Sequence, residues 1–336
     1  MQQQSKGYYV DDQANYTLRS PATMRARLML EVASELAAVR TWPHRQPRIQ
    51  MRPQGAETWG VTLFGSDAAN VVHEVASHDV TFAIVNPSSV LALAIRGLGP
   101  YKEPVPVRGI TVLPQYDQLG FAVHERTGIT SFGELRERKY PLRVSVRGQR
   151  DHSVLVVIEE ILRALGLSLG EIERWGGEVR FEPGMPNLKI DDVANDRLDA
   201  IFDEAMPMYA GAALDAGMRF LRFDESDLHA IEAMGLRRVK LTQDDYASLR
   251  EDTWAIDFSG WTVYTHADVP DDLVTHFCSA LEARKDKIPF FALDGFSAGE
   301  GALPLDQMCK DTKEGPLYVP LHPAAEQFWR DRGYLT

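Results

Sequence analysis

Polar side chains gather at four points in the sequence where a predicted strand gives way to a predicted helix. An arginine stands with hydroxyl residues in the segment 19–23, and an asparagine precedes two serines in 86–89. The segment 147–153 carries two arginines and a histidine, and 203–204 are two adjacent acids. Arginine holds a carboxylate through two hydrogen bonds, and a helix N-terminus attracts anions. These segments therefore predict a site for a small organic anion such as a carboxylate.

The candidate ligand-binding residues come from these segments and from a tyrosine in a connecting segment. They are Arg19, Ser20, Thr23, Asn86, Ser88, Tyr116, Arg147, Gly148, Arg150, His152, Ser153, Asp203 and Glu204. These residue types also have a purely structural interpretation, because serines before a helix suit N-caps and arginines near acids suit surface salt bridges.

The acids and the histidine leave the type of function open. Asp203 and Glu204 could bind a cation or an amino group, act as acid and base, or neutralise the arginines of 147–150. Arginines close by would keep both acids ionised. His152 could act as a general base, cap a helix or hydrogen-bond a ligand. A binding protein needs no catalytic residue here, whereas an enzyme would use His152, Asp203 and Glu204.

Motifs for the common metal and cofactor sites do not occur in the sequence. His73 and His78 are five residues apart, not the four of a helical zinc pair. There is no Walker loop, GxSxG elbow, GxGxxG turn or CxxC pair. We therefore expect no metal and no cofactor, and the common hydrolase, kinase and dehydrogenase classes are unsupported.

The elements that would position these residues alternate between short apolar runs and helical patterns. Residues 80–85 (VTFAIV), 143–146 (RVSV) and 200–202 (AIF) predict buried strands, and 152–165 predicts an amphipathic helix. Such alternation is typical of α/β proteins with mostly parallel sheets. In open α/β sheets ligands bind beyond the carboxyl ends of the strands, where the polar segments lie.

The composition is that of a globular protein. The chain has 336 residues, 44% of them hydrophobic and 25% charged, which suits about two domains. Its formal charge of −12 opposes binding to phosphate backbones, so no nucleic-acid partner is expected. No run of about 20 apolar residues occurs, so the sequence predicts no membrane span. Cys278 and Cys309 could form at most one disulfide.

Six segments occur in an order and spacing that resemble one known family. They are 79–86 (DVTFAIVN), 113–123 (LPQYDQLGFAV), 129–135 (ITSFGEL), 142–148 (LRVSVRG), 198–202 (LDAIF) and 321–325 (LHPAA). Together they resemble the TAXI group of extracytoplasmic solute receptors, the binding subunits of TRAP transporters, over residues 16–335. The charged segments 19–23 and 147–152 depart from the small, glycine-rich loops of that group, which indicates a changed ligand.

The resemblance implies a type II periplasmic-binding-protein fold. In this fold two α/β lobes are joined by two crossing segments, and the ligand is enclosed in the cleft between them. The first lobe would comprise residues 13–124 and 226–336, and the second lobe residues 125–225. The implied partner is a TRAP-type membrane permease.

The N-terminus leaves the compartment open. Residues 1–15 contain no secretory signal, so a receptor would need a signal that has been removed, and would then be periplasmic. If Met1 is the true start, the protein would be cytoplasmic. The alternative function is then an enzyme on the same scaffold, such as a decarboxylase of an aromatic or related carboxylic acid.

Overall fold

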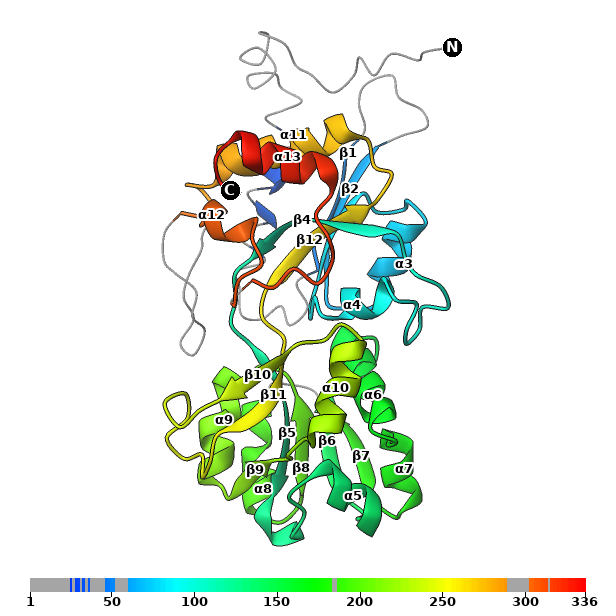
Figure 1. Ribbon diagram of the computed structural model, residues 1–336, viewed down its shortest axis with the longest axis vertical. Coiled ribbons are helices and arrows are strands. Elements are labelled where there is room, and N and C mark those ends of the chain that lie inside the picture. The colour runs from blue at the N-terminus through cyan, green and yellow to red at the C-terminus, as the bar shows by residue number, and fades with distance from the viewer. Residues whose placement is uncertain are drawn as a thin grey trace.

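The computed structural model describes residues 46–51, 60–182, 186–288, 302–313 and 315–336, together with a few isolated positions between 25 and 36. These residues form two units stacked along the long axis of the molecule, each built on one β-sheet (Figure 1). The unit that contains β1 is the first lobe, and the unit that contains β5 is the second lobe.

The first lobe is a five-stranded sheet in the order β1-β2-β3-β12-β4 with helices packed around it. Its strands are β1 (Arg48–Met51), β2 (Val61–Ser66), β3 (Phe82–Val85), β4 (Val107–Leu113) and β12 (Trp261–His266). Its helices are α3 (Val71–Ala76), α4 (Val90–Ala94), α11 (Asp271–Arg284), α12 (Leu305–Met308) and α13 (Pro323–Asp331). β12 comes from late in the chain and lies between β3 and β4.

The second lobe is a seven-stranded sheet in the order β10-β11-β5-β8-β6-β7, with β9 also paired to β5. Its strands are β5 (Gln118–His124), β6 (Arg143–Arg147), β7 (Glu178–Glu182), β8 (Ala200–Asp203), β9 (Met218–Phe220), β10 (Arg238–Leu241) and β11 (Thr253–Asp257). Its helices are α5 (Phe132–Arg138), α6 (Ser153–Ala164), α7 (Leu169–Arg174), α8 (Ile190–Ala194), α9 (Met206–Asp215) and α10 (Glu225–Ala233), with short 3-10 turns η1 (Glu125–Thr127) and η2 (Pro186–Lys189).

The expected α/β class, with two sheets flanked by helices, is confirmed. The expectation of mostly parallel sheets is wrong, because most of the strand pairs are antiparallel. Parallel pairs join β2 to β3, β6 to β7 and β6 to β8. The strands beside the crossings run antiparallel to their neighbours, β5 against β8 and β12 against β3 and β4. They do so because β5 and β12 enter their sheets from the other lobe.

The chain crosses between the sheets twice, at 114–117 and 258–260. The sequence placed the lobe boundaries at 124/125 and 225/226 instead. β5, β10 and β11, which were expected in the first lobe, hydrogen-bond into the second sheet, because β5 pairs with β8 and the β10–β11 pair joins the edge of β5. The segment 225–253, expected to be an irregular connection, contains α10 and β10.

The two crossings lie side by side and hydrogen-bond to each other. The backbone N–H of Phe258 donates to the carbonyl of Asp117 at 2.9 Å, and that of Gly260 donates to the carbonyl of Gln115 at 2.8 Å. Gly260 has a φ of +78°, and a Cβ there would lie 2.7 Å from a methyl of Val112, so the turn requires glycine. We call this short pair of crossings the hinge.

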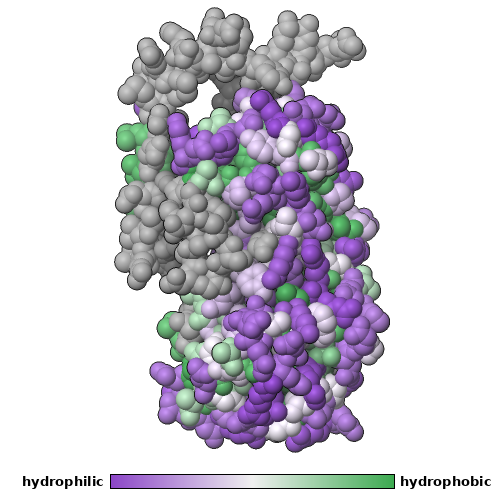
Figure 2. All heavy atoms as spheres, turned by 60° about the vertical axis from the view of Figure 1, so that its left-hand side comes forward, coloured by the Kyte–Doolittle hydropathy of each residue, from purple (hydrophilic) through white to green (hydrophobic). Residues whose placement is uncertain are grey.

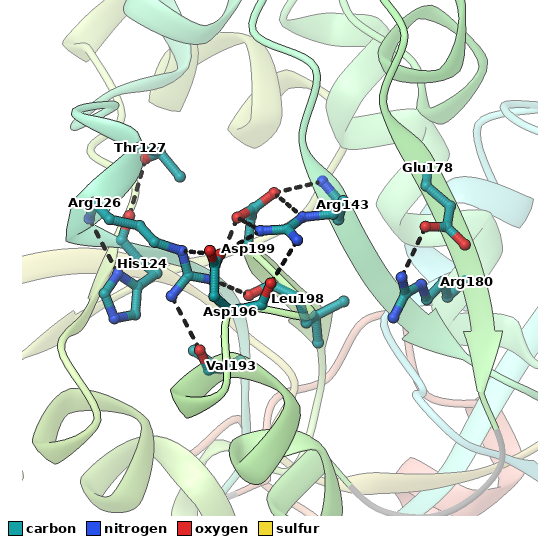
Figure 3. Close-up of polar contacts among 10 residues, drawn as sticks. All are labelled: His124, Arg126, Thr127, Arg143, Glu178, Arg180, Val193, Asp196, Leu198 and Asp199. Atoms are coloured by element: carbon teal, nitrogen blue, oxygen red, sulfur yellow. Dashed lines mark hydrogen bonds and ion pairs between the residues drawn. The ribbon is translucent and has the colours of Figure 1, made fainter.

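At the N-terminal ends of β6 and β8, Asp199 is the centre of a network of arginine contacts (Figure 3). Its carboxylate accepts from the backbone N–H, Nε and Nη2 of Arg143 at 3.0, 2.8 and 2.7 Å, and Nη2 of Arg126 lies 3.3 Å away. Burial alone would raise the pKa of Asp199, but the hydrogen bonds from Arg143 and the two positive charges hold it below its ordinary value. The network ties the starts of the two strands together.

Asp199→Ala is expected to lower the free energy of unfolding by about 2–3 kcal/mol at pH 7, because it leaves the backbone N–H and Nε of Arg143 without the acceptor they have in Asp199. The carboxylate's contribution should disappear as the pH falls from the ordinary pKa of 3.8 through the lower folded-state pKa. Glu178→Ala removes an exposed ion pair to Arg180 and is the matched control, with an expected change below about 0.5 kcal/mol. Urea denaturation measures both variants, and equal effects would contradict the central role of Asp199.

Among the described residues, no helix has the length and apolar character needed to span a bilayer. Hydrophilic side chains cover most of the coloured surface on the face shown in Figure 2. Buried apolar side chains form clusters inside the molecule, and one of these clusters includes side chains from both lobes.

Candidate functional site

An arginine–aspartate pair lies at the carboxyl ends of two neighbouring strands of the second lobe. Arg147 is the last residue of β6 and Asp203 the last of β8, and the parallel register of these strands places them side by side. Nε and Nη2 of Arg147 lie 3.1 and 2.9 Å from Oδ1 of Asp203. The side chain of Arg147 is 14% exposed and that of Asp203 is 0% exposed, so the pair is removed from bulk water.

Glu204 extends this pair to the first lobe. Its Oε1 accepts from Nη2 of Arg147 at 3.1 Å and from Nδ2 of Asn86 at 3.2 Å, and Nε2 of His152 lies 3.5 Å away. Asn86 directly follows β3, and its own Oδ1 accepts from the indole N–H of Trp261 at 3.0 Å. One buried carboxylate oxygen therefore joins a residue of each lobe.

Two more buried charged groups border the cluster. Nζ of Lys189 lies 3.6 Å from Oδ2 of Asp203 and donates to the carbonyl of Val146 at 3.2 Å. Asp117 lies in the first crossing, and its Oδ2 accepts from the backbone N–H of Ala205 at 3.1 Å. The site thus reaches from the strand ends to the hinge.

Burial decides the protonation of the cluster. It raises the pKa of Glu204 to about 7, although Arg147 acts in the opposite direction, and it raises the pKa of Asp117 well above the ordinary range. Burial and then the charge of Arg147 lower the pKa of His152 to about 4, so the imidazole is neutral at pH 7. The expectation that nearby arginines keep both acids ionised does not hold fully for Glu204, whose raised pKa leaves it partly protonated at pH 7 because the loss of water outweighs the arginine.

Two carboxylate oxygens of this cluster have unused hydrogen-bonding capacity among the described residues. Oε2 of Glu204 is buried and accepts no hydrogen bond there, and Oδ2 of Asp203 has only the ammonium of Lys189 nearby, at 3.6 Å. A buried oxygen without a donor costs free energy, so such atoms are found where a ligand or a proton completes the site. A protonated Glu204 could itself donate a hydrogen bond to an anionic ligand.

The loop before the second-lobe helix α6 is bonded directly to the first lobe. The backbone N–H and Oγ of Ser153 both donate to the carbonyl of Asp67, at 2.7 and 2.9 Å. The carbonyl of Asp151 accepts from the backbone N–H of Ala69 at 3.2 Å. His152 caps α6, since its Nδ1 accepts from the backbone N–H of Val154 at 3.1 Å. The two lobes are therefore in contact at the predicted binding loop.

The structure brings together five of the expected residues and places others elsewhere. Arg147, His152, Asp203, Glu204 and Asn86 form the cluster, with Ser153 in the adjoining contact between the lobes. The expected residues Arg19, Ser20 and Thr23 lie outside the described residues.

Two further expected residues do not join the cluster. Ser88 is buried between β3 and β12, where it donates to the carbonyl of Val85 and accepts from the N–H of Thr262. Arg150 is exposed, and its guanidinium carbon lies 3.6 Å from the ring centroid of Phe181. Both side chains thus have structural partners.

Two more expected residues lie at the border of the site. Tyr116 is in the first crossing, with Nζ of Lys313 4.8 Å from its ring centroid. Gly148 is half-buried directly after β6, next to Arg147. Tyr116 thus lies at the hinge and Gly148 beside Arg147. A ligand contact for either residue stays a prediction.

Sequence reasoning missed one residue of the cluster and undervalued another. Lys189 lies in the segment 188–197, for which the sequence predicts a helix, and nothing in its local pattern marks it as the partner of Asp203. For Trp261 the sequence favours core packing over a place in an aromatic cleft wall, but it follows the second crossing and its indole donates to Asn86. A polar or aromatic residue at the first position after a crossing is the signal that could have identified it.

An open pocket of about 200 Å³ lies elsewhere on the second lobe. Its lining includes Thr130, Arg219, Arg222, Leu249 and Arg250, none of which belongs to the cluster. Arg219 and Arg250 both contact Glu125, and Arg222 donates to Thr130. The pocket's arginines are thus already engaged by neighbouring side chains.

The comparisons with known proteins identify the family. Residues 57–333 match the family model described as "NMT1-like family", and because this is most of the chain, the chain belongs to the NMT1-like family. No curated protein is significantly similar to the chain. The fold assignment itself rests on the strand order and the layers described above.

Solved structures with a related arrangement are remote. The aliphatic sulphonate binding protein SsuA from Escherichia coli is 12% identical, with a TM-score of 0.32, over 64% of this chain and 57% of that one. The alkanesulfonate-binding protein SsuA from Xanthomonas axonopodis pv. citri is 14% identical, with a TM-score of 0.28, over 47% and 48%. A binding protein component of a phosphonate transporter from Pseudomonas aeruginosa is 9% identical, with a TM-score of 0.33, over 69% and 68%. The matched part is thus about half the length of the two SsuA proteins.

Proposed function

We propose that the protein is a solute receptor that binds a small organic acid between its lobes, with the acid's carboxylate on Arg147. The observation that carries this proposal is the position of Glu204. Its carboxylate accepts from Arg147 of the second lobe and from Asn86 of the first lobe. A ligand carboxylate that took this place would form the same two bonds, and Glu204 would withdraw.

Binding of this kind would couple the ligand to the relative position of the lobes. Arg147 and Asn86 belong to different sheets, and the lobes are connected only by the two crossings and their contacts within the described residues. A ligand that bonds to both residues favours the arrangement in which they are close. When no ligand is bound, the short hinge would allow the two lobes to move apart.

The transport role follows from the sequence resemblance. The chain's strand-end segments resemble TAXI-type receptors, and such a receptor delivers its ligand to a membrane permease of the TRAP type. The proposal accordingly includes this permease as partner and a periplasmic location. Charged residues at the binding loop, where TAXI proteins have small ones, support a ligand different from theirs.

A second function, acid–base catalysis on a bound acid, is favoured by one observation. Glu204 has a pKa raised to about 7 by burial and lies beside Arg147 and a neutral His152. A carboxyl group tuned to this range can donate a proton near neutral pH. A decarboxylase would need such a donor to protonate the carbanion after carbon dioxide leaves.

A thermal-shift screen of carboxylic acids, each paired with its primary amide, tests both functions. A ligand present at 100 times its dissociation constant should raise the melting temperature by about 5 °C, because it binds only the folded state. We expect acids to stabilise, their amides not to, and the acids to be recovered unchanged by mass spectrometry. Stabilisation by amines alone would contradict an anion site. Chemical conversion of a stabilising acid would show that the protein acts as an enzyme rather than as a receptor.

A further inference from the structure

Two histidines and an aspartate from distant parts of the sequence meet on the surface of the first lobe. Suitable ligand atoms of His78, His266 and Asp268 all lie within 4.8 Å of one another. Nε2 of His78 is 3.8 Å from Oδ2 of Asp268, and Nδ1 of His266 contacts Oδ1 of the same carboxylate. The two imidazole rings lie 4.3 Å apart between centroids.

The sheet topology is what brings these residues together. β12 pairs antiparallel with β3, with Thr265 opposite Phe82, so the end of β12 lies beside the beginning of β3. His266 is the last residue of β12, and Asp268 follows in the next turn. His78 stands in the turn between α3 and β3, with a φ of 63° that directs the chain back toward the strand. Local histidine spacing could not reveal a cluster separated by 188 residues, the difference between 266 and 78.

We infer that His78, His266 and Asp268 form a binding site for a divalent transition-metal ion such as Zn²⁺ or Ni²⁺. Neutral imidazole and carboxylate are ligands these ions prefer, and two histidines with one carboxylate supply three of the positions of a zinc centre. Water would complete the coordination, because the side chains of His78 and Asp268 are 54% and 65% exposed.

The arrangement is partly organised before any metal binds. The side chain of His266 is only 13% exposed, and its ring is held by Asp268 and by the ring of His78. Bound zinc ligands lie about 3.3 Å from one another at normal bond lengths. Small rotations of the exposed His78 and Asp268 are therefore enough to bring the ligand atoms to that distance.

The site is separate from the interlobe cluster. Trp261, which donates to Asn86 in that cluster, is the first residue of β12, and His266 is the last. Failure of the metal site would thus leave the proposed ligand binding unaffected, and the reverse also holds. A metal here would join the turn before β3 to the end of β12 and stabilise the first sheet.

Isothermal titration of the tag-free full chain with ZnCl₂ and NiCl₂ tests the inference. We expect one ion per chain, and at least about tenfold weaker binding in His78→Asn and in His266→Gln. Asparagine is chosen because it tolerates the left-handed backbone of residue 78. Zinc should also raise the melting temperature of the wild type and not that of the two variants.

His229→Ala is the matched control. His229 is an exposed histidine on α10 of the second lobe with Glu225 3.4 Å away, so it offers a histidine–carboxylate pair without a third ligand. This variant should bind metal like the wild type. Circular dichroism without metal checks that every variant is folded. Absence of binding by the wild type, or equal binding by the wild type and the His78 and His266 variants, would overturn the site.

Discussion

Replacing Arg147 by methionine is expected to abolish binding of the organic acid and to lower the free energy of unfolding by about 3–5 kcal/mol at pH 8. The binding loss follows because Arg147 is the donor proposed to hold the ligand's carboxylate. The stability loss follows because Asp203 and Glu204 are buried. Without Arg147, Lys189, 3.6 Å from Asp203, is the one cation beside them in the part of the chain that the structure describes. Urea denaturation and isothermal titration with a stabilising acid measure the two effects.

The protein contains a matched control for this variant on the same two strands. Arg143, the first residue of β6, and Asp199, directly before β8, stand four residues before Arg147 and Asp203. They form a similar arginine–aspartate pair at the other ends of the strands. Arg143→Met should also destabilise the protein, while ligand affinity stays within about twofold of the wild type. Equal loss of binding in both variants would show that Arg147 acts through the fold alone, and retained binding in Arg147→Met would contradict the proposed site.

The difference in pH dependence between these two variants adds a second check. Lowering the pH to 6 protonates Glu204 in large part, since its pKa is about 7. The Arg147→Met variant then has one buried negative charge fewer to accommodate, so its destabilisation should shrink between pH 8 and pH 6. The destabilisation of Arg143→Met should stay nearly constant over this range.

The sequence located the core of the site because that part of the site follows a local rule. Side chains directly after parallel strands meet at one sheet edge. β6 and β8 obey this rule, and Arg147 and Asp203 lie side by side at their carboxyl ends. Their contact with a ligand stays a prediction. Asn86 follows β3 in the same way, and its partner Glu204 comes from the other sheet.

The parts that were missed depend on contacts between distant segments. β12 lies between β3 and β4, which brings Trp261 to Asn86 and His266 to His78, although each pair is far apart in the sequence. Apolar runs predict that a strand exists but not which strands it will pair with. For the same reason the crossing before β5 could not be placed, since only the pairing of β5 with β8 assigns it to the second sheet.

The protonation of Glu204 could not be predicted from neighbouring charges alone. Its sequence neighbours and the arginines suggested an ionised carboxylate, but the contact between the lobes removes water from it. Burial and the charge of Arg147 act in opposite directions on the Glu204 carboxylate. Replacing Glu204 by glutamine therefore tests which of the two has the larger effect on stability.

Glu204→Gln is expected to raise the free energy of unfolding by about 3 kcal/mol at pH 8, by less than about 1 kcal/mol at pH 5, and hardly at all at pH 4. The folded-state pKa of about 7 lies above the ordinary value of 4.5. A carboxyl group with a raised pKa contributes its full stability below the unfolded-state pKa and loses it as the pH rises through the folded-state pKa. Glutamine cannot ionise, so the variant should lack this decline between pH 4.5 and 7.

The same substitution should change how ligand binding depends on pH. A ligand carboxylate on Arg147 would lie next to Glu204, and two adjacent carboxylates favour protonation of one of them. The wild type should therefore take up a proton on binding, and its affinity should fall by about tenfold per pH unit above pH 7. In Glu204→Gln the affinity should be constant from pH 6 to 8, since the amide can donate to the ligand in either condition.

Two outcomes would separate the stability argument from the binding argument. If the Glu204→Gln protein is less stable than the wild type at pH 8, the ion pair between Glu204 and Arg147 stabilises the fold by more than burial of the charged carboxylate destabilises it. Affinity that is independent of pH in the wild type would mean that the ligand does not displace Glu204 from Arg147, whichever way the stability changes. The carboxylate of Glu204 would then be a permanent part of the wall, and the ligand would have to bring a donor for its free Oε2.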